Sequence, residues 1–228
     1  MYGLIVFDVD GTFYDINNVV ARNYEIQIDF IMGRTGLSRP EVVAYFEKNN
    51  IFPQMTSSSK SATELFLRDG YSRAEWNAFR EARFPVDAID CSSAVDRSTI
   101  EGFKSLSPHC VLLSSNSYST ISKILNRLGL SVDMFDAIVC SDRCPVEGPF
   151  NKKAAMAFLL PKFNVPASGM LSIGDRYNTD VLPALELGGA GVVVAKPRAL
   201  GVLLNDMRNE RMGDCSAYKF FKTIKELA

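Results

Sequence analysis

The sequence predicts an α/β fold in which a doubly wound parallel sheet carries an inserted helical segment. Leu4–Phe7 is a continuously apolar run that contains β-branched residues, as expected for a strand that helices cover on both faces. From Ser98 onward, predicted helices and strands alternate, and this alternation is typical of a parallel sheet with helices on both sides. A third observation, a long stretch of helical character between the first two strands, predicts the insertion.

The alternating segments justify the sheet element by element. Hydrophobic patterning predicts helices at 98–105, 118–128, 152–163 and 179–187, and strands at 110–114, 137–141, 170–174 and 191–195. A last short strand at 217–221 and a terminal helix complete the expected order. Because the carboxyl ends of parallel strands meet at one edge of a sheet, polar residues that follow these strands are expected to lie together there.

The insertion follows the first strand. About 100 residues separate the first strand from the second, far more than a crossover connection needs. Apolar residues recur at helical spacing over Val19–Met32, and capping boxes open further helices at Ser38 and Ser72. We therefore expect residues 1–15 and 86–228 to form the α/β core and residues 16–85 to form a separate helical unit.

Composition excludes several classes of protein. A chain of 228 residues with 47% hydrophobic and 22% charged residues is typical of a globular protein with one sizeable core and an insert. The formal net charge is −1, without a block of like charge, so no nucleic-acid partner is expected. The sequence has no apolar run of about 18 residues, and its first residues are not expected to form a signal peptide. A cytoplasmic protein without membrane contact is expected.

Cysteine and histidine usage narrows the chemistry. Five cysteines without paired spacing disfavour a disulfide framework and a zinc site, and a single histidine, His109, disfavours histidine-based hydrolases. Residues 91–98 match the Cys-x5-Arg-Ser spacing of cysteine phosphatases. This match is weak because the segment has no glycine and places Asp96 where an anion would bind.

Two carboxylates follow the first predicted strand. Side chains alternate along a strand, so Asp8 and Asp10 point the same way, and one can attack a substrate while the other transfers protons. This division suits phosphoryl transfer through an aspartyl phosphate. Gly11 supplies the tight turn, and an ordinary Asp-Gly turn without chemistry is the alternative interpretation.

A second acidic segment follows the predicted strand at 170–174. Mg²⁺ binds oxygen ligands and keeps several waters, so few carboxylates suffice to hold it. We expect Asp8, Asp175 and Asp180 to be these ligands, together with the main-chain carbonyl of Asp10. For Asp175 alone, the cap of a helix is the alternative role.

The motif DVDGTFYD at residues 8–15 resembles the Asp-x-Asp-Gly-Thr motif of the haloacid dehalogenase-like hydrolase superfamily. Ser115-Asn116, after the second strand, resembles the motif whose hydroxyl binds the transferred phosphoryl group, and Gly174-Asp175 with Asp180 resembles the metal-binding motif. The remaining motif is a lysine. Lys152 opens a predicted helix and is favoured over Lys153, although the usual Lys-Pro pair is absent. A cation is unfavourable at a helix N-terminus, and an anionic ligand would remove this conflict.

The resemblance implies a Rossmann-like core with a helical C1-type cap and a Mg²⁺-dependent phosphatase activity. Asp8 would be the nucleophile and Asp10 the acid and base. Lys152 and Ser115 would hold the phosphoryl oxygens, with Gly11, Thr12 and Asn116 completing the phosphate site. The expected substrate is a small phosphorylated metabolite, namely a nucleoside monophosphate, phosphoglycolate or a sugar phosphate. The oligomeric state stays open.

Several alternatives remain at this stage. Asp10 argues against a dehalogenase, since a halide leaving group needs no proton, whereas a phosphomutase stays open. A phosphonatase would need a lysine from the cap, such as Lys48 or Lys60, and a catalytically idle binding protein is the alternative outside enzymes. Tyr14 gives some similarity to pyrimidine 5'-nucleotidases, which usually have Asn at the position of Gly11. The polar segment Thr56–Lys60 is a candidate for selecting the leaving group.

Overall fold

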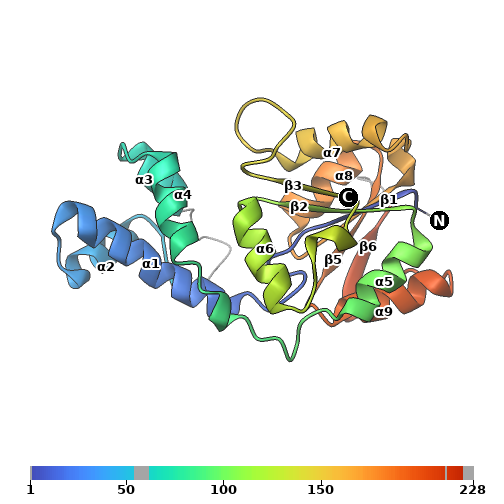
Figure 1. The fold of residues 1–228 in the computed structure, drawn as a ribbon, viewed down its shortest axis with the longest axis horizontal. Helices are drawn as coiled ribbons and strands as arrows, with labels where there is room; N and C mark the ends of the chain where they lie inside the picture. The colour runs from blue at the N-terminus through green and yellow to red at the C-terminus, as the bar shows by residue number, and fades with distance from the viewer. Residues whose placement is uncertain (1, 54–61, 214, 223–228) are drawn as a thin grey trace. The chain divides into compact units, whose positions relative to one another are not determined.

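The computed structural model describes residues 2–53, 62–213 and 215–222 and contains two compact units. One unit comprises Met1–Asp15 with Asp90–Ala228, and the other comprises Ile16–Ile89. Figure 1 shows both units as a ribbon coloured by residue number. The helical unit ends at residue 89 rather than at 85, because the 3₁₀ turn Val86–Ala88 contacts helix α1 (Asn17–Thr35) of the same unit.

The first unit is built on a six-stranded sheet with the order β3-β2-β1-β4-β5-β6. Five strands are parallel, and β6 pairs antiparallel with β5, so the expectation of a parallel sheet holds for all but the last strand. The strands are β1 (Leu4–Phe7), β2 (His109–Ser114), β3 (Ala137–Cys140), β4 (Met170–Gly174), β5 (Ala190–Val194) and β6 (Tyr218–Phe221).

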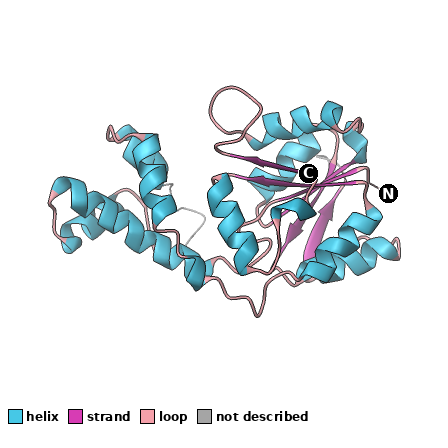
Figure 2. Ribbon diagram, viewed as in Figure 1, coloured by secondary structure: helices cyan, strands magenta, loops and turns pink. Residues whose placement is uncertain are grey.

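Helices cover both faces of this sheet (Figure 2). They are α5 (Arg97–Leu106), α6 (Tyr118–Arg127), α7 (Lys152–Lys162), α8 (Leu182–Glu186) and α9 (Ala199–Arg208). Leu4 and Val6 pack in one cluster with residues of α7 and α8, whereas the Phe7 ring lies 5.2 Å from the Phe103 ring of α5. Successive side chains of β1 therefore enter different cores, which explains why the strand is apolar at every position.

The helix expected at 179–187 begins differently from the prediction. The segment Tyr177–Val181 forms one π-helical turn, and α8 follows it with Pro183 in its first turn. The Ser172 hydroxyl donates a hydrogen bond of 2.7 Å to the carbonyl of Asp180, which ties this turn to β4. Single π-helical turns are frequent at functional sites, and this one carries Asp180.

The second unit contains α1, α2 (Arg39–Lys48), α3 (Ala62–Arg68) and α4 (Arg73–Ala82), and it has its own apolar core. The Phe30 ring of α1 lies 5.0 Å from the Trp76 ring and 5.2 Å from the Phe66 ring. The indole N–H of Trp76 donates to Thr63 at 2.9 Å, so the polar atom of this buried side chain is satisfied. The proposed selectivity segment Thr56–Lys60 lies outside the described residues.

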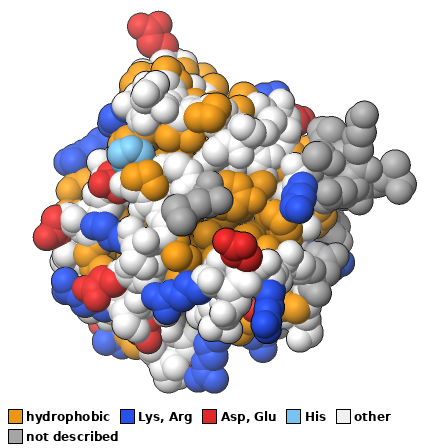
Figure 3. All heavy atoms as spheres, turned by 90° about the vertical axis from the view of Figure 1, so that its right-hand side faces the viewer, with side chains coloured by type: hydrophobic (Ala, Val, Ile, Leu, Met, Phe, Trp, Pro, Cys, Tyr) orange, Lys and Arg blue, Asp and Glu red, His pale blue; other side chains and the backbone are white. Residues whose placement is uncertain are grey.

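No described helix is long and apolar enough to cross a membrane. On the face of the molecule seen in Figure 3, Lys and Arg side chains are interspersed with Asp and Glu side chains. Neither sign of charge gathers into a continuous patch among the described side chains of this face, in keeping with the formal net charge of −1.

Candidate active site

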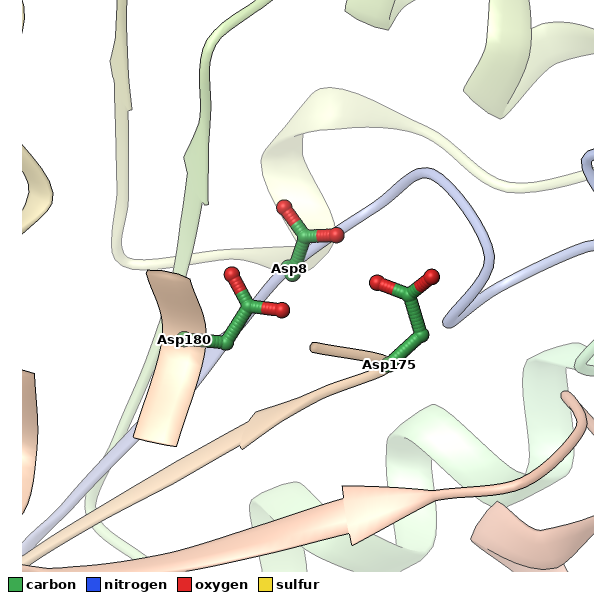
Figure 4. A group of neighbouring side chains, drawn as sticks. All are labelled: Asp8, Asp175 and Asp180. Atoms are coloured by element: carbon green, nitrogen blue, oxygen red, sulfur yellow. The ribbon is translucent and has the colours of Figure 1, made fainter. Parts of the chain in front are cut away.

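The site begins where β1 ends. The N–H of Asp8 donates to the carbonyl of Ile173 at 2.9 Å, so the pairing of β1 with β4 continues one residue beyond the strand. This pairing places Asp8 beside the end of β4. Asp175 is the residue that follows β4 in the chain. In Figure 4 the carboxylates of Asp8, Asp175 and Asp180 face a common space. One oxygen from each lies within 4.8 Å of the other two.

The turn after Asp8 depends on Gly11. Its φ is +78°, in the left-handed region, and a Cβ atom at this position would overlap the carboxylate of Asp175. The N–H groups of Thr12 and Phe13 both donate to the carbonyl of Val9, which closes the turn. Glycine is therefore required for conformation and for space, and the turn brings two acidic segments into contact.

Lys152 joins two of the acids. The side chain of Asn151 caps α7 by accepting from the N–H of Ala154 at 3.0 Å, and Lys152 is the first helical residue. Its ammonium group lies 2.6 Å from Oδ1 of Asp8 and 2.7 Å from Oδ1 of Asp180. These carboxylates offset the unfavourable position of a cation at a helix N-terminus. Lys153 instead forms an exposed ion pair with Glu186 at 2.8 Å.

Asp180 is fixed by its neighbours. The N–H of Arg176 donates to Oδ2 at 2.9 Å, and the Thr179 hydroxyl donates to Oδ1 at 3.1 Å. The Asp180 side chain also lies over Gly174, where a Cβ atom would clash with it. Asp175, in contrast, has a distant ion pair of 3.8 Å with Arg176.

Asp10 is held by two donors. The Tyr14 hydroxyl donates to Oδ1 of Asp10, and the side-chain amide of Asn116 donates to Oδ2 at 2.5 Å. Burial, reinforced by Asp10, raises the pKa of Tyr14 well above its usual range, so its hydroxyl stays protonated. Asn116 is also among the phosphate ligands expected from the sequence, and in this structure its amide contacts Asp10.

The electrostatics of the site favour a bound cation. Burial raises the pKa of Asp8 to about 8 although Lys152 lowers it, and burial with the nearby Asp180 raises the pKa of Asp175 to about 6. Burial lowers the pKa of Lys152, but Asp8 and Asp180 outweigh it and raise that pKa above its usual range. Asp8 and Asp180 thus share the ammonium group of Lys152. Together with Asp175 they have the oxygen chemistry and proximity that suit a divalent cation.

Two other residues predicted for the site, Ser115 and Thr12, have no side-chain role in the contacts described above. Ser115 is exposed directly after β2, and Thr12 is fully buried with a hydroxyl that has no partner among the described residues. Lys48, the residue considered for a phosphonatase, is exposed at the end of α2 in the other unit, and Lys60 lies outside the described residues.

The cysteine-phosphatase pattern at residues 91–98 does not form an anion site. Asp96 caps α5 by accepting from the N–H of Thr99 at 2.7 Å, and Arg97 pairs with Glu101 at 2.8 Å. Its charged residues therefore have structural partners.

Two contacts of the site were not predicted from sequence. Tyr14 donates to Asp10 because of the tight turn at Gly11. This turn brings Tyr14, four residues after Asp10, back to the Asp10 carboxylate. The role of Thr179 depends on the π-helical turn. The signal in the sequence was an aromatic residue with a hydroxyl group, Tyr14, four positions after Asp10 in the motif at residues 8–15.

Comparisons with known proteins identify the family of this chain. The profile of the haloacid dehalogenase-like hydrolases matches residues 2–188. Curated protein sequences yield no match to this chain.

Solved structures with the same fold cover most of the chain at low sequence identity. A CbbY variant from Rhodobacter sphaeroides in complex with xylulose-1,5-bisphosphate has a TM-score of 0.55 and 17% identity, covering 84% of this chain and 85% of that one. A predicted phosphoglycolate phosphatase from Haemophilus somnus has a TM-score of 0.52 and 18% identity, with 86% of each chain covered. The HAD-hydrolase YfnB from Bacillus subtilis, bound to magnesium, has a TM-score of 0.52 and 17% identity, covering 90% and 99%.

The family match extends from β1 through α8 and therefore includes every acidic residue of the site. On this match, the chain belongs to the haloacid dehalogenase-like hydrolases.

Proposed function

We propose that this hydrolase is a phosphatase that cleaves small phosphomonoesters through a phosphorylated Asp8, with a divalent cation such as Mg²⁺ at the acidic cluster. The observation that carries the proposal is the position of Lys152, which contacts Asp8 and Asp180 beside three converging carboxylates. An ammonium group beside these acids suits the binding of a phosphoryl group, which brings further negative charge and needs cations around it.

In the first step, an oxygen of Asp8 forms a bond to phosphorus while the ester bond to the leaving group breaks. Asp10 gives its proton to the departing oxygen, so the leaving group departs as an alcohol. Lys152 and the exposed hydroxyl of Ser115 bind the phosphoryl oxygens. The ammonium group of Lys152 is nearly buried. It stabilises the transition state most strongly, because negative charge shifts there.

In the second step, Asp10 takes a proton from water as the water oxygen attacks phosphorus, and the bond to Asp8 breaks. Inorganic phosphate leaves and Asp8 is restored. Asp8, Asp175, Asp180 and the carbonyl of Asp10 would hold the cation, which would offset the repulsion between the carboxylates and the phosphate.

The proposed substrates are small phosphorylated metabolites. Among the proteins of the same fold, one is a predicted phosphoglycolate phosphatase and another is a complex with a sugar bisphosphate. Nucleoside monophosphates stay in the set of candidates. We propose the helical unit Ile16–Ile89 as the cap that selects among leaving groups, since the site residues described above address the phosphoryl group that all these substrates share.

The activity is tested with purified protein and p-nitrophenyl phosphate at saturating Mg²⁺, followed by a screen of phosphoglycolate, sugar phosphates and nucleoside monophosphates. Hydrolysis that stops on chelation, returns with added Mg²⁺ and is absent from Asp8→Asn supports the proposal. Full activity of Asp8→Asn would exclude Asp8 as the nucleophile.

A further inference from the structure

Tyr14 and Asn116 contact opposite oxygens of the same carboxylate, that of Asp10. We propose that both are positioning residues, which hold the Asp10 carboxylate in one orientation through the two proton transfers of the reaction. This inference rests on the proposed function, because it assigns a role to residues that act through the proposed acid and base.

The turn at Gly11 fixes the position of Tyr14. The backbone of Tyr14 forms a bridge with that of Asp10, so the side chain returns to the acid only four residues further along the chain. The ring of Tyr14 is fully buried, which leaves its hydroxyl little freedom to move. A buried, rigid tyrosine loses little side-chain entropy when it forms a hydrogen bond, since packing has already ordered it.

Asn116 approaches Asp10 from a different segment, at the end of β2. Its N–H donates to the hydroxyl of Ser114 at 3.2 Å, and its carbonyl accepts from the N–H of Ser141 at 3.0 Å. Two neighbouring strands therefore fix the backbone of Asn116, and its side chain is 6% exposed. Donors from two separate segments oppose rotation of the Asp10 carboxylate in either direction.

Tyr14 and Asn116 differ in whether the Asp10 oxygen that they contact can carry a proton. An amide NH₂ group only donates, so Asn116 keeps Oδ2 of Asp10 as an acceptor. The Tyr14 hydroxyl donates to only one of the two lone pairs of Oδ1, so the contact persists while the other lone pair carries the proton that passes to the leaving group. The pair thus holds the carboxylate both when it gives its proton to the leaving group and when it takes one from water. Proton transfer requires such alignment, because misplacement of the acid reduces its contribution to the rate.

We expect the loss of activity on removal of a donor to Asp10 to depend on the leaving group of the ester. Tyr14→Phe removes one hydroxyl and keeps the buried ring. We expect the first-step rate for an alkyl phosphate, measured by pre-steady-state kinetics, to fall about 10- to 100-fold, in the range set by hydrogen bonds to charged groups. The KM should stay nearly constant. The first-step rate for p-nitrophenyl phosphate, read from the burst of p-nitrophenol, should fall by less than about threefold, because this leaving group needs little protonation. We expect the same pattern for Asn116→Ala.

Tyr218→Phe is the matched control. Tyr218 is also buried in the α/β unit, and its hydroxyl donates to Oδ2 of Asp206 at 2.7 Å. Its loss should leave both rates unchanged. The melting temperatures of all variants show whether a rate difference follows from unfolding.

A double variant separates positioning from a general structural effect. In an Asp10→Asn background, Tyr14→Phe should cause no further loss on the alkyl phosphate, because its contribution passes through Asp10. Equal losses of the first-step rate on both esters in the single variant, or an additive loss in the double variant, would overturn this inference while the phosphatase activity remained. Activity of Asp8→Asn would overturn the proposed function and this inference together.

Discussion

The ammonium group of Lys152 lies 2.6 Å from Oδ1 of Asp8 and connects the proposed nucleophile with Asp180, at 2.7 Å. These residues come from β1, α7 and the π-helical turn after β4, so the contact depends on the assembled sheet rather than on any local motif. The Lys152 side chain is 13% exposed, and removing it would leave two buried carboxylates without their cation.

Lys152→Ala should therefore affect both stability and activity. Breaking a buried ion pair by removing one partner typically costs about 3–5 kcal/mol, and the proposed phosphoryl ligand is lost as well. Lys153→Ala is the matched control, since it removes an exposed pair worth about 0–1 kcal/mol. Urea unfolding and hydrolysis of p-nitrophenyl phosphate measure both effects. Equal behaviour of the two variants would contradict the assignment of Lys152.

Asp10→Asn should slow turnover of alkyl phosphates by roughly 10²- to 10⁴-fold, the usual contribution of a general acid or base. The loss in the first step should shrink for esters with good leaving groups, because these depart without a proton. Pre-steady-state kinetics with alkyl and p-nitrophenyl phosphates separates the two steps. An equal loss of the first-step rate for both esters would argue against Asp10 as the acid.

Without metal, Asp175 should make stability depend on pH. Its folded-state pKa is about 6, above the usual 3.8, so the folded protein binds the proton more tightly than the unfolded chain. Stability is then lost as pH rises from about 4 to 6. In chelator at neutral pH, Asp175→Asn should raise the melting temperature by roughly 2–4 °C, and this gain should vanish near pH 4.

Added Mg²⁺ should stabilise the wild-type protein more than Asp175→Asn, since only the former retains the full set of carboxylates. A variant less stable than the wild type in chelator at neutral pH would show that Asp175 has a stabilising partner instead.

Thr12→Val distinguishes two roles for a buried hydroxyl. The Thr12 side chain is fully buried, and its hydroxyl has no partner among the described residues. Valine has a similar shape and no hydroxyl, so the substitution should stabilise the protein by about 1 kcal/mol. If Thr12 acts only in packing, kcat/KM stays near the wild-type value. A loss of tenfold or more with unchanged stability would instead support the phosphate contact expected from the sequence.

The sheet was predictable because its signals are local. The apolar runs of β1 and β4 end in acids and that of β2 ends in Ser115-Asn116, and each apolar run forms a strand close to its expected limits. The start of α8 was predicted less well, because the π-helical turn depends on the bond from Ser172 to Asp180, which no periodicity in the segment reveals. The antiparallel direction of β6 likewise depends on its pairing with β5.

Within the site, sequence indicated which residues to consider but not how they pair. Lys152 and Lys153 are adjacent and chemically identical, and only the rotation of α7 directs one to Asp8 and the other to Glu186. Asn116 was expected to bind phosphate, and its contact with Asp10 follows from the neighbouring position of β1 and β2. Contacts of this kind join residues about 100 positions apart and require the fold.

The central claim is that Asp8 carries the phosphoryl group, and the most direct measurement uses the Asp10→Asn variant. With p-nitrophenyl phosphate the first step needs no acid, whereas release of phosphate from Asp8 still needs a base, so the intermediate should accumulate. Rapid acid quenching followed by peptide mass spectrometry is expected to find a phosphoryl group on Asp8, matched by a burst of p-nitrophenol close to one per enzyme. A burst of p-nitrophenol without phosphorylated Asp8 would contradict the account.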